Sequence, residues 1–285
     1  MTIERARLAG GVQVPAFMYG TAWKEEHTRR CVRQAIDAGF RAIDTANQRK
    51  HYLEEQVGEA ISAAVSGGSI QSPADLFLQT KFTHADGQDE RLPYDGKAPV
   101  ATQVKQSCES SLEHLGVSVI DSYVLHGPST RVGLAPRDLD AWFAMEELQR
   151  AGKVRLLGVS NVTRAQLDLL LTAATVAPAF VQNRCYAKRG WDREVRAACQ
   201  ERGIVYQGFS LLTANRTEID GPVIGDVGKR AQLTRHQVVF LFAMQVGMLA
   251  LTGTTSVAHL KEDLAVFDAK PLSGEDVTRI ERVSG

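Results

Sequence analysis

The chain has 285 residues, a length that accommodates one large domain or two ordinary ones. Its 33 basic and 33 acidic residues balance, which argues against nucleic acid or an anionic membrane as a partner. With 44% hydrophobic and 23% charged residues, the composition is that of a globular protein with a full core.

Four cysteines lie far apart, with no CxxC pair and no histidines at ligand spacing. They are Cys31, Cys108, Cys185 and Cys199. We expect buried free thiols, no metal site and a reducing, cytoplasmic location. The N-terminal sequence MTIERARLAGG lacks the apolar run of a signal peptide, and the apolar stretch 238–251 is too short to span a bilayer.

Taken in order, the chain begins with a weakly alternating β-hairpin at 6–14 and a buried strand at 15–20. Short apolar runs then alternate with helical patterns to the end. Further strands are expected at 41–44, 75–81, 119–126, 154–159, 179–183, 204–209 and 249–252. Helices are expected at 24–38, 52–65, 100–115, 138–151, 163–174, 191–202, 222–230, 234–247, 257–266 and 274–283.

Strands buried on both faces and each followed by a helix favour a parallel sheet in an α/β protein. Eight such units in this length favour closure into a (β/α)8 TIM barrel, a single domain over 1–285 with a short N-terminal β-hairpin and extra C-terminal helices. An open, doubly wound sheet is the alternative. No glycine-rich GxGxxG turn follows the first strand, which argues against it.

Three expected strands end on a single ionisable residue, and a phenol follows one of them. Asp44, Lys81 and His126 stand at the strand ends, and Tyr52 follows Asp44. Because the strands of a barrel carry the active site at one shared face, these side chains would meet there. Each alone has an ordinary explanation: a turn aspartate, a paired lysine or a structural histidine. Together they are the parts of a proton-donating site.

The stretch GFRAIDTANQRKHYLEEQVGEAI at 39–61 resembles the signature of the aldo-keto reductase family. In that signature a strand ends on Asp-Thr-Ala, and Tyr precedes a helix containing Val-Gly. Lys81, His126, the GVSN at 158–161 and the FSLL at 209–212 follow in the family's order. The resemblance implies reversible reduction of an aldehyde or ketone to an alcohol by a nicotinamide cofactor, more commonly NADPH (NADP) than NADH (NAD).

The resemblance also assigns roles. Tyr52 would protonate the carbonyl oxygen, Lys81 would lower the pKa of that phenol, and Asp44 would pair with Lys81. His126 would orient the substrate carbonyl. The hydride belongs to the cofactor.

The turn after Asp44 departs from the family spacing. Tyr52 stands further from Asp44 than usual, and counting back from Val57-Gly58 puts His51 in the tyrosine position. We assign the proton donor to Tyr52 because a phenol does this chemistry, and His51 is the alternative.

A cofactor-binding set is implied by the same resemblance. Its members are Gly20, Thr21, Ser160, Asn161, Asn183, Phe209, Ser210, Leu211, Gly253, Thr254, Thr255 and His259. The amides and hydroxyl of Ser160, Asn161 and Asn183 would bind the nicotinamide carboxamide, and Phe209 would stack on its ring.

The segment 253–256 would offer N–H groups and hydroxyls to a phosphate at a helix start. Relatives that use NADPH carry a Lys and an Arg here, and Gly253 and His259 replace them. We therefore expect weak discrimination against NADH.

Trp23 and His126 are expected to contact a small-molecule carbonyl substrate, with the loops 82–99 and 127–137 around the mouth. The chain ends soon after its last expected helix, which favours an open pocket for bulky or varied carbonyls. The expected assembly is a monomer or a weak homo-oligomer.

Two other functions fit parts of this pattern. A regulatory subunit of the same fold would bind the cofactor with little turnover. A phosphate-handling barrel isomerase or lyase would use Lys81 as a Schiff base and need no nicotinamide.

Overall fold

The computed structural model describes residues 4–283. Its strands are β1 (Ala6–Ala9), β2 (Val12–Pro15), β3 (Phe17–Gly20), β4 (Ala42–Asp44), β5 (Phe77–Phe82), β6 (Ile120–Leu125), β7 (Val154–Ser160), β8 (Phe180–Arg184), β9 (Val205–Phe209) and β10 (Leu249–Thr252). Its α-helices are α1 (Thr28–Ala38), α2 (Glu54–Ser66), α3 (Val100–Leu115), α4 (Pro136–Arg150), α5 (Arg164–Ala173), α6 (Arg193–Glu201), α7 (Arg216–Asp220), α8 (Pro222–Ala231), α9 (Arg235–Gln245), α10 (Val257–Leu264) and α11 (Gly274–Glu281).

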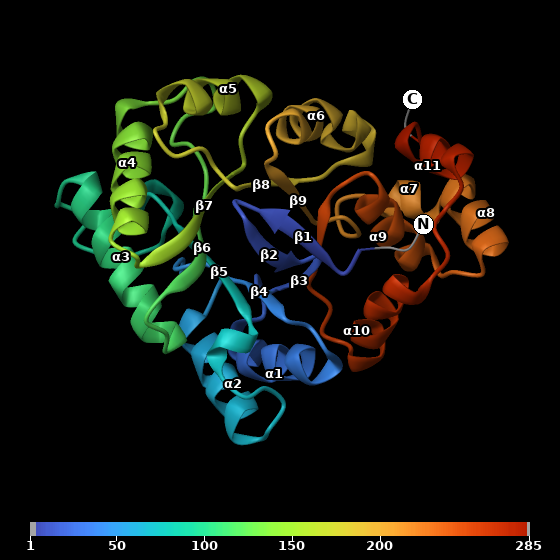
Figure 1. The fold of residues 1–285 in the computed structure, drawn as a ribbon, viewed down its shortest axis with the longest axis horizontal. Coiled ribbons are helices and arrows are strands. Elements are labelled where there is room, and N and C mark those ends of the chain that lie inside the picture. The colour runs from blue at the N-terminus through green and yellow to red at the C-terminus, as the bar shows by residue number, and fades with distance from the viewer. Residues whose placement is uncertain (1–3, 284–285) are drawn as a thin grey trace. The chain divides into compact units, whose positions relative to one another are not determined.

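Within the described residues, eight strands form a closed barrel in the order β10-β3-β4-β5-β6-β7-β8-β9, and β1 and β2 form a separate antiparallel hairpin (Figure 1). The (β/α)8 barrel, the N-terminal hairpin and the extra C-terminal helices are confirmed. Several elements differ from expectation, among them α7 and α2. The short helix α7 lies where a loop was expected, and α2 begins at Glu54, so that Tyr52 belongs to the preceding turn.

The chain divides into two compact units. One, here called the central unit, comprises Tyr19–Val181; the other, the terminal unit, comprises Met1–Met18 and Gln182–Gly285. The single-domain organisation over 1–285 stays a prediction.

In the central unit, β3 to β7 run parallel, with Gly20 beside Asp44 and Lys81 beside Val124. Their carboxyl ends therefore lie at one edge. Helix α1 packs on α2, α2 on α3, and α3 on α4 (Figure 1). All six residues of β5 are buried, as in a parallel strand covered on both faces. This strand carries Lys81 into the interior.

In the terminal unit, β9 and β10 pair in parallel, and Leu249 lies beside Gln207. Helix α9 is buried from Val238 to Met244, as expected of the long apolar stretch. The Phe17 ring packs on Phe240, with centroids 4.8 Å apart.

All four cysteines are buried and, within the described residues, none forms a disulfide, as expected. Among residues 4–283, no helix combines the length and the apolar character needed to cross a bilayer.

Gly58 lies where α2 meets the end of α3. A Cβ at this position would stand 1.9 Å from the carbonyl oxygen of His114. Backbone cannot yield as a flexible side chain can, so only glycine permits this approach of the two helices. The glycine of the Val-Gly pair is therefore needed for the close packing of α2 against α3.

We predict that Gly58→Ala lowers the free energy of unfolding by about 1–3 kcal/mol, because the overlap outweighs the better helix propensity of alanine. Gly274→Ala is the matched control, since a Cβ there meets nothing within 4 Å. Urea unfolding followed by circular dichroism measures both. Equal stability of the two variants would contradict the packing role.

Candidate active site

The four residues expected to perform proton chemistry lie together in the central unit. The Lys81 Nζ donates hydrogen bonds to Asp44 Oδ1 at 2.6 Å and to the Thr45 carbonyl at 2.7 Å. The same Nζ lies 5.5 Å from the centroid of the Tyr52 ring. The Tyr52 and His126 rings meet edge to face, with centroids 6.0 Å apart. A carboxylate, an amine, a phenol and an imidazole thus share one place.

The parallel strands produce this meeting. Asp44 is the last residue of β4, Lys81 the last but one of β5, and His126 follows β6, where its N–H donates to the Phe82 carbonyl at 2.9 Å. Residues two apart in a strand point the same way, so Gln79 faces the same interior as Lys81. The Gln79 Nε2 donates to Asp44 Oδ1 at 2.7 Å.

The ion pair of Lys81 and Asp44 is buried, with side-chain exposures of 1% and 6%. Burial lowers the pKa of the Lys81 amine, while the charge of Asp44, its hydrogen bond and the charge of Glu54 act to raise it. An ammonium at this depth needs its carboxylate partner. Asp44 therefore orients the amine and favours its charged form.

The pKa of the Tyr52 phenol is raised, first by burial and second by the negative charge of Asp44. This direction is opposite to the expected lowering by Lys81. The physical reason is that burial disfavours the phenolate and the negative charge of Asp44 disfavours it further. At neutral pH the phenol is protonated, which is the form that can donate a proton.

His126 is neutral. Burial, with the positive charges of Lys81 and His51, lowers its pKa to about 3. Its Nδ1 lies 2.7 Å from the hydroxyl oxygen of Thr83, and its carbonyl accepts from Asn161 Nδ2 at 2.8 Å. A neutral imidazole has one N–H. When the Thr83 hydroxyl donates to Nδ1, Nε2 carries the hydrogen and can donate a hydrogen bond to a carbonyl oxygen.

His51, the alternative proton donor, has a different environment. Its ring packs on the Trp23 ring with centroids 3.7 Å apart, and the Trp23 N–H donates to its carbonyl at 2.8 Å. The Lys81 ammonium lies over the Tyr52 ring instead. Burial, above all, lowers the pKa of His51. Trp23 is 67% exposed, so one face of this stack is open to an incoming molecule.

In the central unit, the expected cofactor residues stand at strand ends. Gly20 ends β3, and both the N–H and the hydroxyl of Thr21 donate to the Asp44 carbonyl, at 3.0 and 3.1 Å. Ser160 ends β7. The Asn161 Nδ2 donates to the Ser160 hydroxyl at 3.1 Å. Thr21 is thus bonded to the backbone at the end of β4, and Asn161 to the backbone after β6 through the His126 carbonyl.

The other expected cofactor residues belong to the terminal unit. The Asn183 Nδ2 donates to Asp192 Oδ2 at 2.9 Å, and the Tyr206 hydroxyl donates to the same oxygen at 2.8 Å. Phe209 ends β9 and is partly exposed, while Leu211 is buried.

Ser210, between them, has a positive φ of 55°. After β10, the segment Gly253-Thr254-Thr255 leads into α10. The Ser256 hydroxyl caps this helix by accepting from the His259 N–H at 3.4 Å, and the Thr254 hydroxyl lies 3.5 Å from His259 Nδ1.

Sequence reasoning missed two residues that support the site. Thr83 holds His126, as described above. Glu54 opens α2 and is buried; it accepts from the Thr80 hydroxyl and lies 3.2 Å from His114 Nδ1. Its spacing to Val57 and Ile61, which places all three on one helical face, was an available signal of burial.

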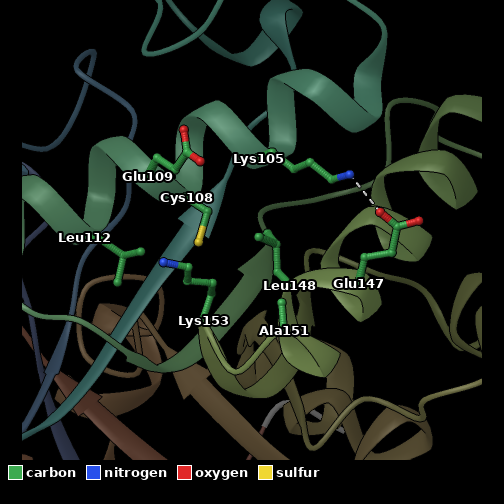
Figure 2. Close-up of a pocket in the computed structure, with 8 residues that line it drawn as sticks. All are labelled: Lys105, Cys108, Glu109, Leu112, Glu147, Leu148, Ala151 and Lys153. Carbon is green, nitrogen blue, oxygen red and sulfur yellow. Dashed lines mark ion pairs between the residues drawn. The ribbon is translucent and has the colours of Figure 1, made fainter.

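A separate pocket of about 310 Å³ lies between α3 and α4 (Figure 2). Its lining residues are Lys105, Cys108, Glu109, Leu112, Glu147, Leu148, Ala151 and Lys153. Lys105 and Glu147 form an ion pair of 2.8 Å beside it. Burial raises the pKa of the Cys108 thiol to about 12, so it is a poor nucleophile at neutral pH. This pocket contains none of the expected catalytic residues.

Comparison with known proteins agrees with the fold. The profile of the Aldo/keto reductase family matches residues 16–284. Oxidoreductase YtbE of Bacillus subtilis (strain 168), itself uncharacterised, is 30% identical over 98% of this chain and 92% of its own. The crystal structure of an aldo/keto reductase from Brucella melitensis has a TM-score of 0.83 and 25% identity, covering 99% of this chain and 98% of that one.

A further solved structure is that of an aldo-keto reductase complexed with NADPH. Its TM-score is 0.84 at 22% identity, and the match covers 100% of this chain and 89% of that one. At this identity the likeness supports the fold.

The low pKa of His126 predicts an acid-sensitive fold. The folded protein leaves His126 unprotonated down to about pH 3, whereas the unfolded chain protonates it near pH 6.5. Its contribution to stability is full above pH 6.5 and is lost as the pH falls towards 3. We predict that the wild type loses about 2 kcal/mol more than His126→Asn between pH 8 and pH 5, measured by urea unfolding. Equal losses of stability in both proteins would contradict an imidazole that the fold keeps neutral.

Proposed function

The chain belongs to the aldo/keto reductase family, and from this premise we propose that it reduces an aldehyde or ketone to the alcohol, reversibly, with a nicotinamide cofactor. The observation that carries this proposal is the position of Tyr52. Its ring lies 5.5 Å from the Lys81 Nζ and edge to face with His126, so a phenol, an amine and an imidazole are neighbours.

The side chains suit the cofactor. Carboxamides pair with amides and hydroxyls such as those of Ser160, Asn161 and Asn183, and the partly exposed ring of Phe209 suits a planar heterocycle. We propose that the cofactor also contacts four further residues at or just after strand ends: Gly20, Thr21, Ser210 and Leu211. When bound, the cofactor supplies the hydride.

The start of α10 suits a phosphate. The segment 253–256 precedes the first turn, where helix N–H groups favour an anion, and Ser256 adds a hydroxyl. Thr254, Thr255 and His259 would contact it. Because Gly253 and His259 replace cationic residues, we propose NADPH as the usual donor with NADH also accepted.

The chain's own residues would move the proton. As the carbonyl oxygen gains negative charge, the Tyr52 hydroxyl donates its proton to that oxygen. The Lys81 ammonium, held by Asp44, stabilises the phenolate that remains. His126 Nε2–H donates a hydrogen bond to the same oxygen and fixes its place. Trp23, with its exposed face, contacts the substrate near this point.

We propose a cytoplasmic location, which four cysteines without disulfides among the described residues support. We propose a monomer or weak homo-oligomer acting on a small-molecule carbonyl compound.

Carbonyl-dependent oxidation of NADPH and of NADH, followed by absorbance over a panel of aldehydes and ketones, tests this function. We predict turnover with both cofactors and the lower KM for NADPH. Tyr52→Phe should reduce kcat by roughly 10²-fold or more, because no other group donates the proton. His51→Asn, one residue away, is the matched control and should retain most activity.

Three outcomes would contradict the proposal. Full activity of Tyr52→Phe together with loss of activity in His51→Asn would show that His51, and not Tyr52, is the proton donor. Cofactor binding without carbonyl-dependent oxidation would indicate a regulatory subunit. Trapping of substrate on Lys81 by borohydride, with no need for nicotinamide, would indicate Schiff-base chemistry.

A further inference from the structure

The turn that delivers Tyr52 is longer than in the family pattern and contains no helix or strand. Such a segment has conformational freedom that must be removed before a side chain at its end is held in one place. The N–H groups of His51 and Tyr52 both donate to the Gln48 carbonyl, at 3.2 and 3.0 Å. The place of Tyr52 therefore depends on the place of Gln48.

Gln48 is in turn held by the loop 82–99. Its Nε2 donates to the Gly87 carbonyl at 2.7 Å, and the Gln88 Nε2 donates in the opposite direction, to the Asn47 carbonyl, at 2.8 Å. We call this reciprocal pair of bonds the glutamine clasp. Gln48 and Gln88 are 7% and 9% exposed, so water does not readily replace either bond. Loss of one amide leaves a buried carbonyl without its donor.

Other contacts anchor the two ends of the turn. The Asn47 Nδ2 donates to the Ser107 carbonyl and the Ser110 hydroxyl, each at 3.1 Å, which fastens the start of the turn to α3. Near its end, the Trp23 N–H bonds to the His51 carbonyl. The glutamine clasp holds Gln48, which lies between these two anchored ends and whose carbonyl accepts from the Tyr52 N–H.

The same loop also supports His126. The Tyr94 hydroxyl donates to the Thr83 carbonyl at 2.6 Å, and the Thr83 hydroxyl contacts the imidazole. The loop 82–99 thus reaches both groups that would bond to the carbonyl oxygen.

We propose that Gln48 and Gln88 are positioning residues for the reaction, and that through the glutamine clasp the loop 82–99 fixes the Tyr52 phenol for proton transfer. This role rests on the proposed function of Tyr52. A displacement of about 1 Å in a reacting group can cost roughly 10²-fold in rate. Loss of the clasp therefore affects turnover more than cofactor binding.

Gln48→Ala and Gln88→Ala test the clasp, and Gln103→Ala is the matched control. Gln103 is also buried and donates its Nε2 to the Ala98 carbonyl of the same loop at 2.9 Å, away from the Tyr52 turn. We expect each clasp variant to lower kcat about tenfold or more, with unchanged NADPH Kd. The solvent deuterium isotope effect on kcat should rise, because proton transfer becomes slower relative to the other steps. Gln103→Ala should change neither quantity.

A second measurement does not need turnover. Amide hydrogen exchange of Tyr52 and His51 should accelerate at least fivefold in the clasp variants and remain as in the wild type in Gln103→Ala. Circular dichroism and thermal unfolding of each variant verify that it is folded.

Unchanged kcat and unchanged exchange in both clasp variants would overturn the proposal. An equal fall of kcat in Gln103→Ala would also overturn it, since the effect would then be a general loosening of the loop. If the wild type reduces no carbonyl compound, the proposed function fails, and the exchange rates alone decide the clasp: faster exchange supports it and unchanged exchange refutes it.

Discussion

The buried ion pair of Lys81 with Asp44 is the interaction on which the rest of the site depends. An amine at this depth loses its hydration, and an unpaired ammonium there would cost several kcal/mol. The carboxylate must therefore stand at the end of the neighbouring strand, and the parallel pairing of β4 with β5 places it there. Asp44 also accepts from Gln79, which in turn accepts from Ser122. The Lys81–Asp44 pair is therefore part of a layer of hydrogen-bonded polar side chains.

This layer divides the interior of the central unit. Two residues before Gln79, Phe77 packs edge to face on Phe180, with centroids 5.9 Å apart. The face of β5 that carries Phe77, Gln79 and Lys81 thus changes from apolar to polar towards the carboxyl end of the strand. The apolar part favours folding, and the polar part sustains a cation beside a phenol that burial keeps protonated. Tyr52 does not belong to a strand. It is held by the turn after β4, which is hydrogen-bonded to the loop 82–99.

The barrel could be predicted, and so could the strand-end positions of Asp44, Lys81 and His126, because each signal is local. Asp44, Lys81 and His126 each end an apolar run, and parallel strands have their ends at one edge. The supporting contacts could not be predicted, because each joins residues remote in sequence. Thr83 meets His126, and Gln48 meets the loop carbonyl of Gly87. The raised pKa of Tyr52 escaped prediction for the same reason, since it depends on burial in the folded chain and on the nearby charge of Asp44.

The central claim is that Tyr52, supported by the Lys81–Asp44 pair, gives its proton to a carbonyl oxygen also bonded by His126. A crystal structure with NADPH and a carbonyl-bearing competitive inhibitor is the most direct measurement. We predict that the inhibitor oxygen lies within hydrogen-bond distance of both the Tyr52 hydroxyl and His126 Nε2. An oxygen bonded to the His51 ring, or bound away from Tyr52, would contradict the account.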